Sequence, residues 1–221
     1  MSNARNLARL IVDSGGDVDV SSLGNVPPSN DASALTTGTL PVGRLPSSGV
    51  DASSLTTGSL GTARLPAGSV IQVVQFNYTS STSIATASYV ALPILASITP
   101  SSTLSKILVR CVIHVGVSGG TEGLHGRLYR NGSVVPIYGD SSGSKDQAWF
   151  HCGAHAGGNE IYAAYAEYLD SPSSTSEQTY QIYGRGHSAP YPIRINSGQD
   201  DPNISQASRT VSSITLMEIA G

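Results

Sequence analysis

A short glycine-rich motif is the first place in this sequence where residue types and spacing suggest chemistry. Residues 116–120 read GVSGG and fit the Gly-x-Ser-x-Gly pattern of a nucleophile elbow. Such an elbow needs a helix directly after the serine, which aims the hydroxyl and builds the oxyanion hole. Here residues 121–125 read TEGLH and lead into a strand-like segment. We therefore interpret the motif as a glycine-rich hairpin loop without a catalytic serine.

A cluster of metal-ligand types follows at His151, Cys152 and His155. A closed zinc site needs four ligands, and this group lacks the paired cysteines that would complete one. Three chains around a threefold axis could each supply a histidine, so a shared metal site stays as a minor alternative. We interpret the cluster as loop histidines beside a buried cysteine and predict no metal and no cofactor. The other histidines are isolated in sequence: His114, His125 and His187.

The acidic residues show no catalytic pairing in sequence. A glycan hydrolase needs two carboxyl groups that face each other across the scissile bond. Residues 199–202 (QDDP) also lack the oxygen-ligand spacing of a calcium loop. We predict that the chain is not an enzyme and that most of its acidic residues are solvated loop charges, among them Asp140, Asp146, Glu160, Glu167 and Asp170.

Aromatic side chains beside glycine-rich loops give the one binding hypothesis. Exposed aromatics with polar neighbours gain affinity at low entropic cost and stack on sugars. The alternative is that each tyrosine fills the core with its hydroxyl at the edge. The predicted receptor-binding residues are Trp149, Tyr183, His187 and Tyr191.

The elements that must position these residues read as short strands. Segments rich in Val, Ile and Tyr, separated by Gly, Ser, Pro and Asp, predict an all-β fold of about nine strands in an antiparallel, jelly-roll-like sandwich over residues 70–221. The expected strands are 70–78, 88–92, 106–115, 124–130, 134–138, 147–152, 161–168, 179–183 and 210–219. Asn131-Gly132 predicts a tight hairpin. We expect strand 106–115 to be central and apolar on both faces, and the last strand to pair with the first.

Composition excludes several classes of function. Charged residues make up 12% of the 221, the net charge is −3, and no basic patch stands out, so nucleic acid is a poor candidate partner. We find no apolar run long enough to span a membrane and no apolar core of an export signal. Cys111 and Cys152 are therefore expected to be free, buried thiols of a protein made in a reducing compartment.

An internal repeat occupies the first third of the chain. Residues 31–50 and 51–70 are identical at twelve of twenty aligned positions. Within the repeat an aliphatic residue recurs at every fifth position, which fits neither the period of a helix nor that of a flat strand. Pro41, Pro46 and Pro66 also exclude a continuous helix. The aliphatic series is Leu35, Leu40, Leu45, Val50, Leu55, Leu60, Leu65 and Val70.

Two structures would bury this series. Three chains could wind around a threefold axis with the aliphatic residues in a narrow core, or one chain could coil as a four-sided β-solenoid. Solenoids need at least three coils, and twenty residues per coil leave about two here. We therefore favour a trimeric shaft over residues 17–69 and retain the solenoid as the alternative.

The opening segment, residues 1–16, contains a short amphipathic stretch. Leu7, Leu10 and Ile11 share one helical face, and Gly15 and Gly16 would end the helix. A helix this short is marginal alone, so we expect it to order by docking on a partner as an anchor. A frayed terminus is the equal alternative.

The segments TTGTLPVGRLP and TTGSLGTARLP resemble the shaft repeats of bacteriophage tail-fibre proteins. The opening NARNLARL is similar to their attachment segments, and GSVIQVVQF and SSITLMEIAG resemble the two ends of a β-domain of phage and cyanophage virion proteins. This resemblance covers the repeat and both ends of the β-domain, but not residues 80–202. It implies a homotrimer fixed to the virion by its N-terminus, with the β-domain distal.

These observations lead to three hypotheses about function. The first is a trimeric tail fibre of the virion, assembled in the host cytoplasm, whose N-terminus binds baseplate, tail or capsid proteins and whose β-head binds a host-surface glycan. The second is a trimeric decoration or cement protein of the capsid. The third is a glycan-cleaving spike enzyme, for which so short a chain leaves little room.

Overall fold

The computed structural model describes residues 65–116, 123–153, 160–186, 192–198 and 200–221. All of these belong to the second of two compact units of the chain, Ser59–Gly221. The predicted anchor and most of the predicted shaft, residues 1–64, lie outside the described residues. Of the aliphatic series, only Leu65 and Val70 are described.

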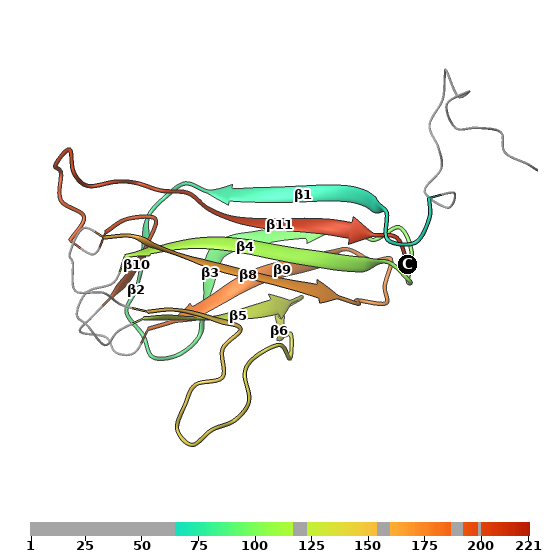
Figure 1. Cartoon of the computed structure of the whole chain (residues 1–221), viewed down its shortest axis with the longest axis horizontal. Coiled ribbons are helices and arrows are strands. Elements are labelled where there is room, and N and C mark those ends of the chain that lie inside the picture. Colours follow the sequence, from blue (N-terminus) through green and yellow to red (C-terminus); the bar gives the residue numbers. More distant parts are fainter. Residues whose placement is uncertain (1–64, 117–122, 154–159, 187–191, 199) are drawn as a thin grey trace, which may run out of the picture. The chain divides into compact units, whose positions relative to one another are not determined.

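All regular structure in the described part is antiparallel β, as the sequence predicts (Figure 1). The first sheet contains β1 (Val70–Tyr78), β2 (Thr82–Ile84), β4 (Lys106–Gly116), β8 (Tyr162–Asp170), β10 (Ile193–Ile195) and β11 (Ser212–Ile219). The second contains β3 (Val90–Ile98), β5 (Leu124–Arg130), β6 (Ser133–Val134), β7 (Phe150–Cys152) and β9 (Gln178–Arg185). No helix among the described residues has the length and apolar character needed to cross a membrane.

The long strands alternate between the two sheets along the chain. In the first sheet they lie in the order β1-β11-β4-β8, and in the second β3, β9 and β5 lie side by side with β6 and β7 on the far edge of β5. Each sheet therefore pairs strands that are distant in sequence, a topology compatible with the expected jelly-roll-like sandwich. The core between the sheets draws on both of them, with fully buried side chains that include Ile94, Val109, Ile113, Leu128, Ile182 and Leu216.

The first and last strands pair along their whole length, as expected. β1 and β11 run antiparallel from Val70 opposite Ile219 to Tyr78 opposite Ser212. Beyond them, Gly68 N donates to Ala220 O at 2.8 Å and Ala220 N donates to Ser69 O at 2.8 Å. The polypeptide therefore enters and leaves this domain at the same end of the same sheet.

The Asn131-Gly132 hairpin is confirmed. Both residues have positive φ, 50° and 78°, as a primed two-residue turn requires. The Asn131 side chain stabilises the turn from outside the hairpin: its Oδ1 accepts from Thr179 N at 2.8 Å, and its Nδ2 donates to Gln178 Oε1 at 3.0 Å.

Several strand predictions need correction. β3 extends to Ile98 although Pro93 lies within it, because a register shift between Ala91 and Leu95 accommodates the proline at a sheet edge. The strand expected at 134–138 is only the two residues of β6. The short strands β2 and β10 were not expected at all. β4 is central, but it is buried on one face only, since Lys106 and Arg110 are exposed on the other.

Two acidic residues, Asp170 and Glu218, are buried at one end of the sandwich, and for Asp170 the expectation of a solvated loop charge is wrong. Asp170, at the end of β8, accepts hydrogen bonds from Tyr180 Oη at 2.7 Å and from Arg130 Nη1, so it joins the two sheets. Glu218, near the end of β11, accepts from Gln72 Nε2 at 2.6 Å and from Ser101 N and Oγ at 2.7 Å each. Burial alone would raise the pKa of Glu218, but these hydrogen bonds outweigh it and the net effect lowers the pKa.

We expect the lowered pKa of Glu218 to appear as acid sensitivity of the domain. A carboxylate whose pKa is lower in the folded state stabilises the fold above its unfolded pKa, and this contribution is lost as the pH falls through the folded pKa. Glu218→Gln should therefore reduce the free energy of unfolding at pH 7. Its difference from the wild type should shrink as the pH drops below 4.5, the ordinary pKa of a glutamate side chain. Urea denaturation at several pH values measures this. Glu177→Gln, at an exposed position, is the control; a deficit that is constant with pH would contradict the assignment.

Candidate binding face

Two of the predicted receptor-binding residues lie on or beside the second sheet, Tyr183 on its outer surface and Trp149 partly packed against the core. Tyr183 lies on β9, and Trp149 immediately precedes β7. The other two, His187 and Tyr191, lie outside the described residues. So do Ser118 of the glycine-rich motif and His155 of the histidine cluster.

Strand alternation determines which side chains form this face. On β5 and β9, Leu124, Leu128, Tyr180 and Ile182 point into the core and are buried. The residues between them therefore point outward, and they are polar, cationic or aromatic: His125, Arg127 and Tyr129 on β5, and Gln181, Tyr183 and Arg185 on β9. We call this surface the cation–aromatic face.

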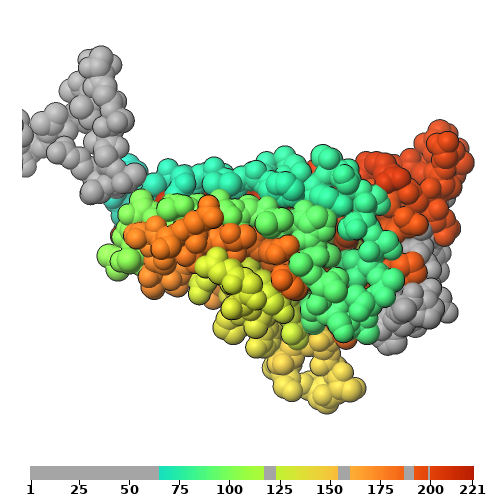
Figure 2. Space-filling view, turned by 180° about the vertical axis from the view of Figure 1, so that it is seen from behind, coloured from blue at the N-terminus to red at the C-terminus, as the bar shows by residue number. Residues whose placement is uncertain are grey.

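A long loop between β6 and β7 covers part of this face. Its two ends are held on β5, where Val135 N donates to Leu128 O at 2.9 Å and Trp149 N donates to Gly126 O at 2.8 Å. Its neck is closed by Gly139 N, which donates to Ala148 O at 3.2 Å. Figure 2 shows the loop, in yellow, standing away from the body of the domain.

Asp146 attaches this loop to the sheet. Its carboxylate accepts a hydrogen bond from Tyr89 Oη at 2.5 Å and lies 3.1 Å from Arg185 Nε, 3.2 Å from His125 Nδ1 and 3.5 Å from Arg127 Nη2. The side chain is 16% exposed, so these contacts are only weakly screened by solvent. Asp146 is therefore a structural anchor of the face, and the expectation of a solvated loop charge is wrong for it.

Aromatic rings pack beside the two arginines. The Tyr129 and Tyr183 rings stack with their centroids 3.7 Å apart. The Arg127 guanidinium carbon lies 4.2 Å from the centroid of Tyr89 and 5.3 Å from that of Tyr138. Burial and the hydrogen bond to Asp146 raise the pKa of Tyr89 far above its usual value, so its hydroxyl remains a donor at any physiological pH. The planar groups are thus fixed in orientation by their neighbours.

An open depression of about 440 Å³ adjoins these groups. Trp149 is half-buried at its rim and meets Phe150 edge-on, with centroids 5.9 Å apart. Phe150 can pack this closely on β5 only because residue 126 is glycine, where a Cβ would lie 2.1 Å from Phe150 Cζ. The side chains that line the depression are those of His125, Lys145, Asp146, Trp149, Phe150 and His151.

The charge of the face favours an anionic or neutral polar ligand. Asp146 is engaged by Arg127, Arg185, His125 and Tyr89, and Lys145 adds a further positive charge at the rim. Cations thus outnumber carboxylates among the described residues of this face. The rim of the depression places Trp149 near Lys145, and this pair is suited to stacking on a sugar ring and binding its acidic substituent.

The structure gives little support for chemistry at the cysteines and histidines. Cys111 and Cys152 are free and buried, as expected, and burial raises the pKa of the Cys111 thiol to about 12. The rings of His125 and His151 lie 4.6 Å apart. No group of three His, Cys, Asp or Glu side chains that could hold a metal ion occurs in the described part of the chain. A metal site shared between three chains stays untested.

Sequence reasoning missed the residues that organise this face. Tyr89, Arg127, Asp146 and Arg185 come from four separate segments, and only the folded chain brings them together. One signal was available: residues 124–130 read LHGRLYR, and the alternation places a histidine, an arginine and a tyrosine on one side of an expected strand.

Comparison with known proteins gives a partial likeness to solved structures. No protein-family model and no curated protein matches the chain. A chain of infectious bursal disease virus, Gt strain, aligns with a TM-score of 0.36 and 11% identity over 74% of this chain and 42% of its own length. A chain of the Gx strain aligns with a TM-score of 0.34 and 11% identity, over 67% and 37%. The VP2 subviral particle of the same virus gives a TM-score of 0.32 and 10% identity, over 74% and 42%.

The chain thus spans less than half the length of these viral chains. At such TM-scores the likeness does not indicate a shared function.

We expect removal of the Asp146 carboxylate to weaken the domain. Asp146→Ala leaves Arg127 and Arg185 without their shared anion, and hydrogen bonds to charged groups are worth about 1.5–3 kcal/mol each, so a loss of about 2 kcal/mol in the free energy of unfolding is expected. Urea denaturation at fixed protein concentration measures it. Asp140→Ala, an exposed carboxylate of the same loop, should change stability by less than about 0.5 kcal/mol. Equal effects of the two replacements would contradict the anchoring role.

Proposed function

We propose that this chain is a structural protein of a virus particle: a trimeric fibre subunit, attached by its N-terminal segment, that presents its β-domain for binding to a host-surface glycan. The observation that carries the proposal is the aliphatic series of residues 35–70, one residue in five, which continues to the first residue of β1. Val70, its last member, is 52% exposed in the single chain. A series of this kind needs other chains to bury it.

The domain that follows suits display at the end of a fibre. Its first and last strands pair in full, so residue 70 sits beside residue 219 at one end of the first sheet. The connections and loops elsewhere are therefore free to carry binding residues, while the sandwich keeps them in place.

The cation–aromatic face supports glycan binding over glycan cleavage. Its carboxylate, Asp146, is occupied by two arginines, a histidine and a tyrosine, and is thus not disposed to act as an acid or a nucleophile. Its depression is open and is flanked by aromatic rings and cations, which is suited to holding a saccharide without distorting it. We therefore propose a binding protein and not an enzyme.

The oligomeric state of the protein in solution tests the proposed trimeric shaft. Leu40→Asp together with Leu60→Asp should break the oligomer, since each buried leucine contributes roughly 1.5–3 kcal/mol and recurs in every chain. Native mass measurement should give three times 22.8 kDa for the wild type and 22.8 kDa for this variant.

The matched control for assembly is Thr37→Asp with Thr57→Asp, which adds the same charges at polar positions of the same repeat. This control should remain an oligomer. A wild-type protein that is monomeric in dilute solution would rule out the leucine-lined shaft. Labelling of the protein on intact particles, seen by electron microscopy, separates a tail fibre from a capsid decoration protein.

Ligand binding can be followed through Trp149, the single tryptophan of the chain. We expect oligosaccharides that contain uronic acids to change its fluorescence and neutral dextran oligosaccharides to do so less, because cations predominate at the face. Tyr183→Ala should weaken the binding free energy obtained from this titration by roughly 1 kcal/mol or more, the scale of an interface aromatic contact. Ile204→Ala, at an exposed apolar position outside both faces, is the control. No response to any glycan of an array would count against this part of the proposal.

A further inference from the structure

The outer face of the first sheet carries a continuous apolar row. Val73 on β1 lies opposite Met217 on β11, Met217 lies opposite Leu108 on β4, and Leu108 lies opposite Leu169 on β8. Their neighbours along the strands, such as Val109 and Leu216, point into the core, so these four point outward. We call these four residues the apolar row.

The apolar row is accessible in the single chain. Val73 is 56% exposed and Leu169 is 44% exposed, while Leu108 and Met217 are half-buried between them. Val70 and Ile219, which also pair across β1 and β11, extend the apolar surface toward the end where the chain enters the domain. Apolar side chains aligned across four strands are unusual on a solvated sheet face and indicate that something covers them.

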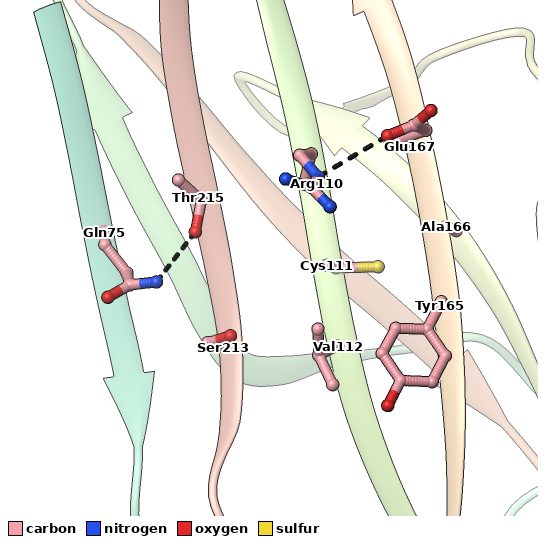
Figure 3. Close-up of a pocket in the computed structure, with 9 residues that line it drawn as sticks. All are labelled: Gln75, Arg110, Cys111, Val112, Tyr165, Ala166, Glu167, Ser213 and Thr215. Atoms are coloured by element: carbon pink, nitrogen blue, oxygen red, sulfur yellow. Dashed lines mark hydrogen bonds and ion pairs between the residues drawn. The ribbon is translucent and has the colours of Figure 1, made fainter.

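The rest of this face holds a row of polar side chains that lines a hollow (Figure 3). Gln75 Nε2 donates to Thr215 Oγ1 at 3.0 Å, and Arg110 Nε lies 3.5 Å from Glu167 Oε2, so the positive and negative charges cancel within the row. A hollow of about 350 Å³ lies over the small side chains of Ser213 and Thr215 on β11. Beside it the Tyr165 ring projects from β8 and is 71% exposed.

We propose that this face binds a second copy of the same chain, so that the β-domains of the oligomer pack on one another through the apolar row and the hollow. This inference rests on the proposed trimer and adds a contact within it. Three features favour a copy of this chain as the occupant.

The first feature is continuity, because the aliphatic series assigned to contacts between chains ends at Val70, on this same face. The second is charge: Arg110 and Glu167 lie side by side, so each can meet its opposite on another copy, and a strongly charged partner would gain nothing. The third is shape, since one face carries both a projecting ring, Tyr165, and a hollow that can receive a side chain. In a closed ring of three chains the projecting part of each copy meets the receiving part of the next, and a face that holds both parts can make both contacts.

Met217 offers a direct probe of this face in the full-length protein. Peroxide converts accessible methionine to its sulfoxide, and mass spectrometry of the peptide that contains Met217 gives the rate. In the wild-type oligomer we expect oxidation several-fold slower than in the Val73→Asp, Leu169→Asp variant. The matched control, Val134→Asp with Ile204→Asp, adds the same charges at exposed apolar positions outside the row and should keep the slow wild-type rate.

The shaft variant Leu40→Asp, Leu60→Asp tests whether a second copy of the chain covers the apolar row, because its replacements lie outside that row. If native mass shows this variant to be monomeric, Met217 should oxidise as fast as in the Val73→Asp, Leu169→Asp variant. Slow oxidation in that monomer would mean that the chain covers its own face and would overturn the proposal. So would fast oxidation of Met217 in a wild-type protein that is an oligomer by mass.

The two proposals fail in different ways. The shaft is ruled out if the leucine replacements leave the oligomer intact in the Val73→Asp, Leu169→Asp background, where the contact between β-domains is already removed, whatever the rate at Met217. The contact between β-domains is ruled out by the Met217 rate while the wild type remains an oligomer.

Discussion

The alternation of side chains along paired strands is the constraint on which the rest of this domain depends. Every long strand gives one set of residues to the layer between the two sheets, where Val109, Ile113, Leu128, Ile182 and Leu216 are fully buried. The other set is left for the two outer surfaces. Because the core is complete without them, the outer sets are free to differ, and one is cationic and aromatic whereas the other is apolar and hydroxyl-rich.

The pairing of β1 with β11 links this core to the repeat that precedes it. The pairs run from Val70 to Tyr78, and the backbone bonds of Gly68 and Ala220 extend the ladder past the strand ends. The buried Glu218 reinforces this end by binding Gln72 and the backbone at Ser101. The start of β1 is therefore held to the end of β11 by a strand pair that runs the full length of both strands.

Features set by local sequence could be predicted, and features set by spatial pairing could not. The bounds of β1 and β5 follow from their apolar patterns, and the Asn-Gly turn follows from its need for two positive φ values. β2 and β10 are three residues each, too short to show a period. Asp146 and Asp170 resemble any loop carboxylate in sequence, and only folding brings arginines to them from other segments. The neighbouring glycine-rich loops predict Trp149 and Tyr183 as receptor-binding residues. In the structure, it is strand alternation that places Tyr183 on the outer face.

The loop between β6 and β7 is tied down at its base, at its neck and through one carboxylate, and residues 140–147, beyond the neck, take no part in the core cluster. Substitutions at its tip can alter what the neighbouring aromatic and cationic groups meet while the sandwich keeps its folding free energy. Such a segment behaves as an exchangeable cassette. Its sequence beyond the neck can therefore change the surface beside the cation–aromatic face without changing how the two sheets pack.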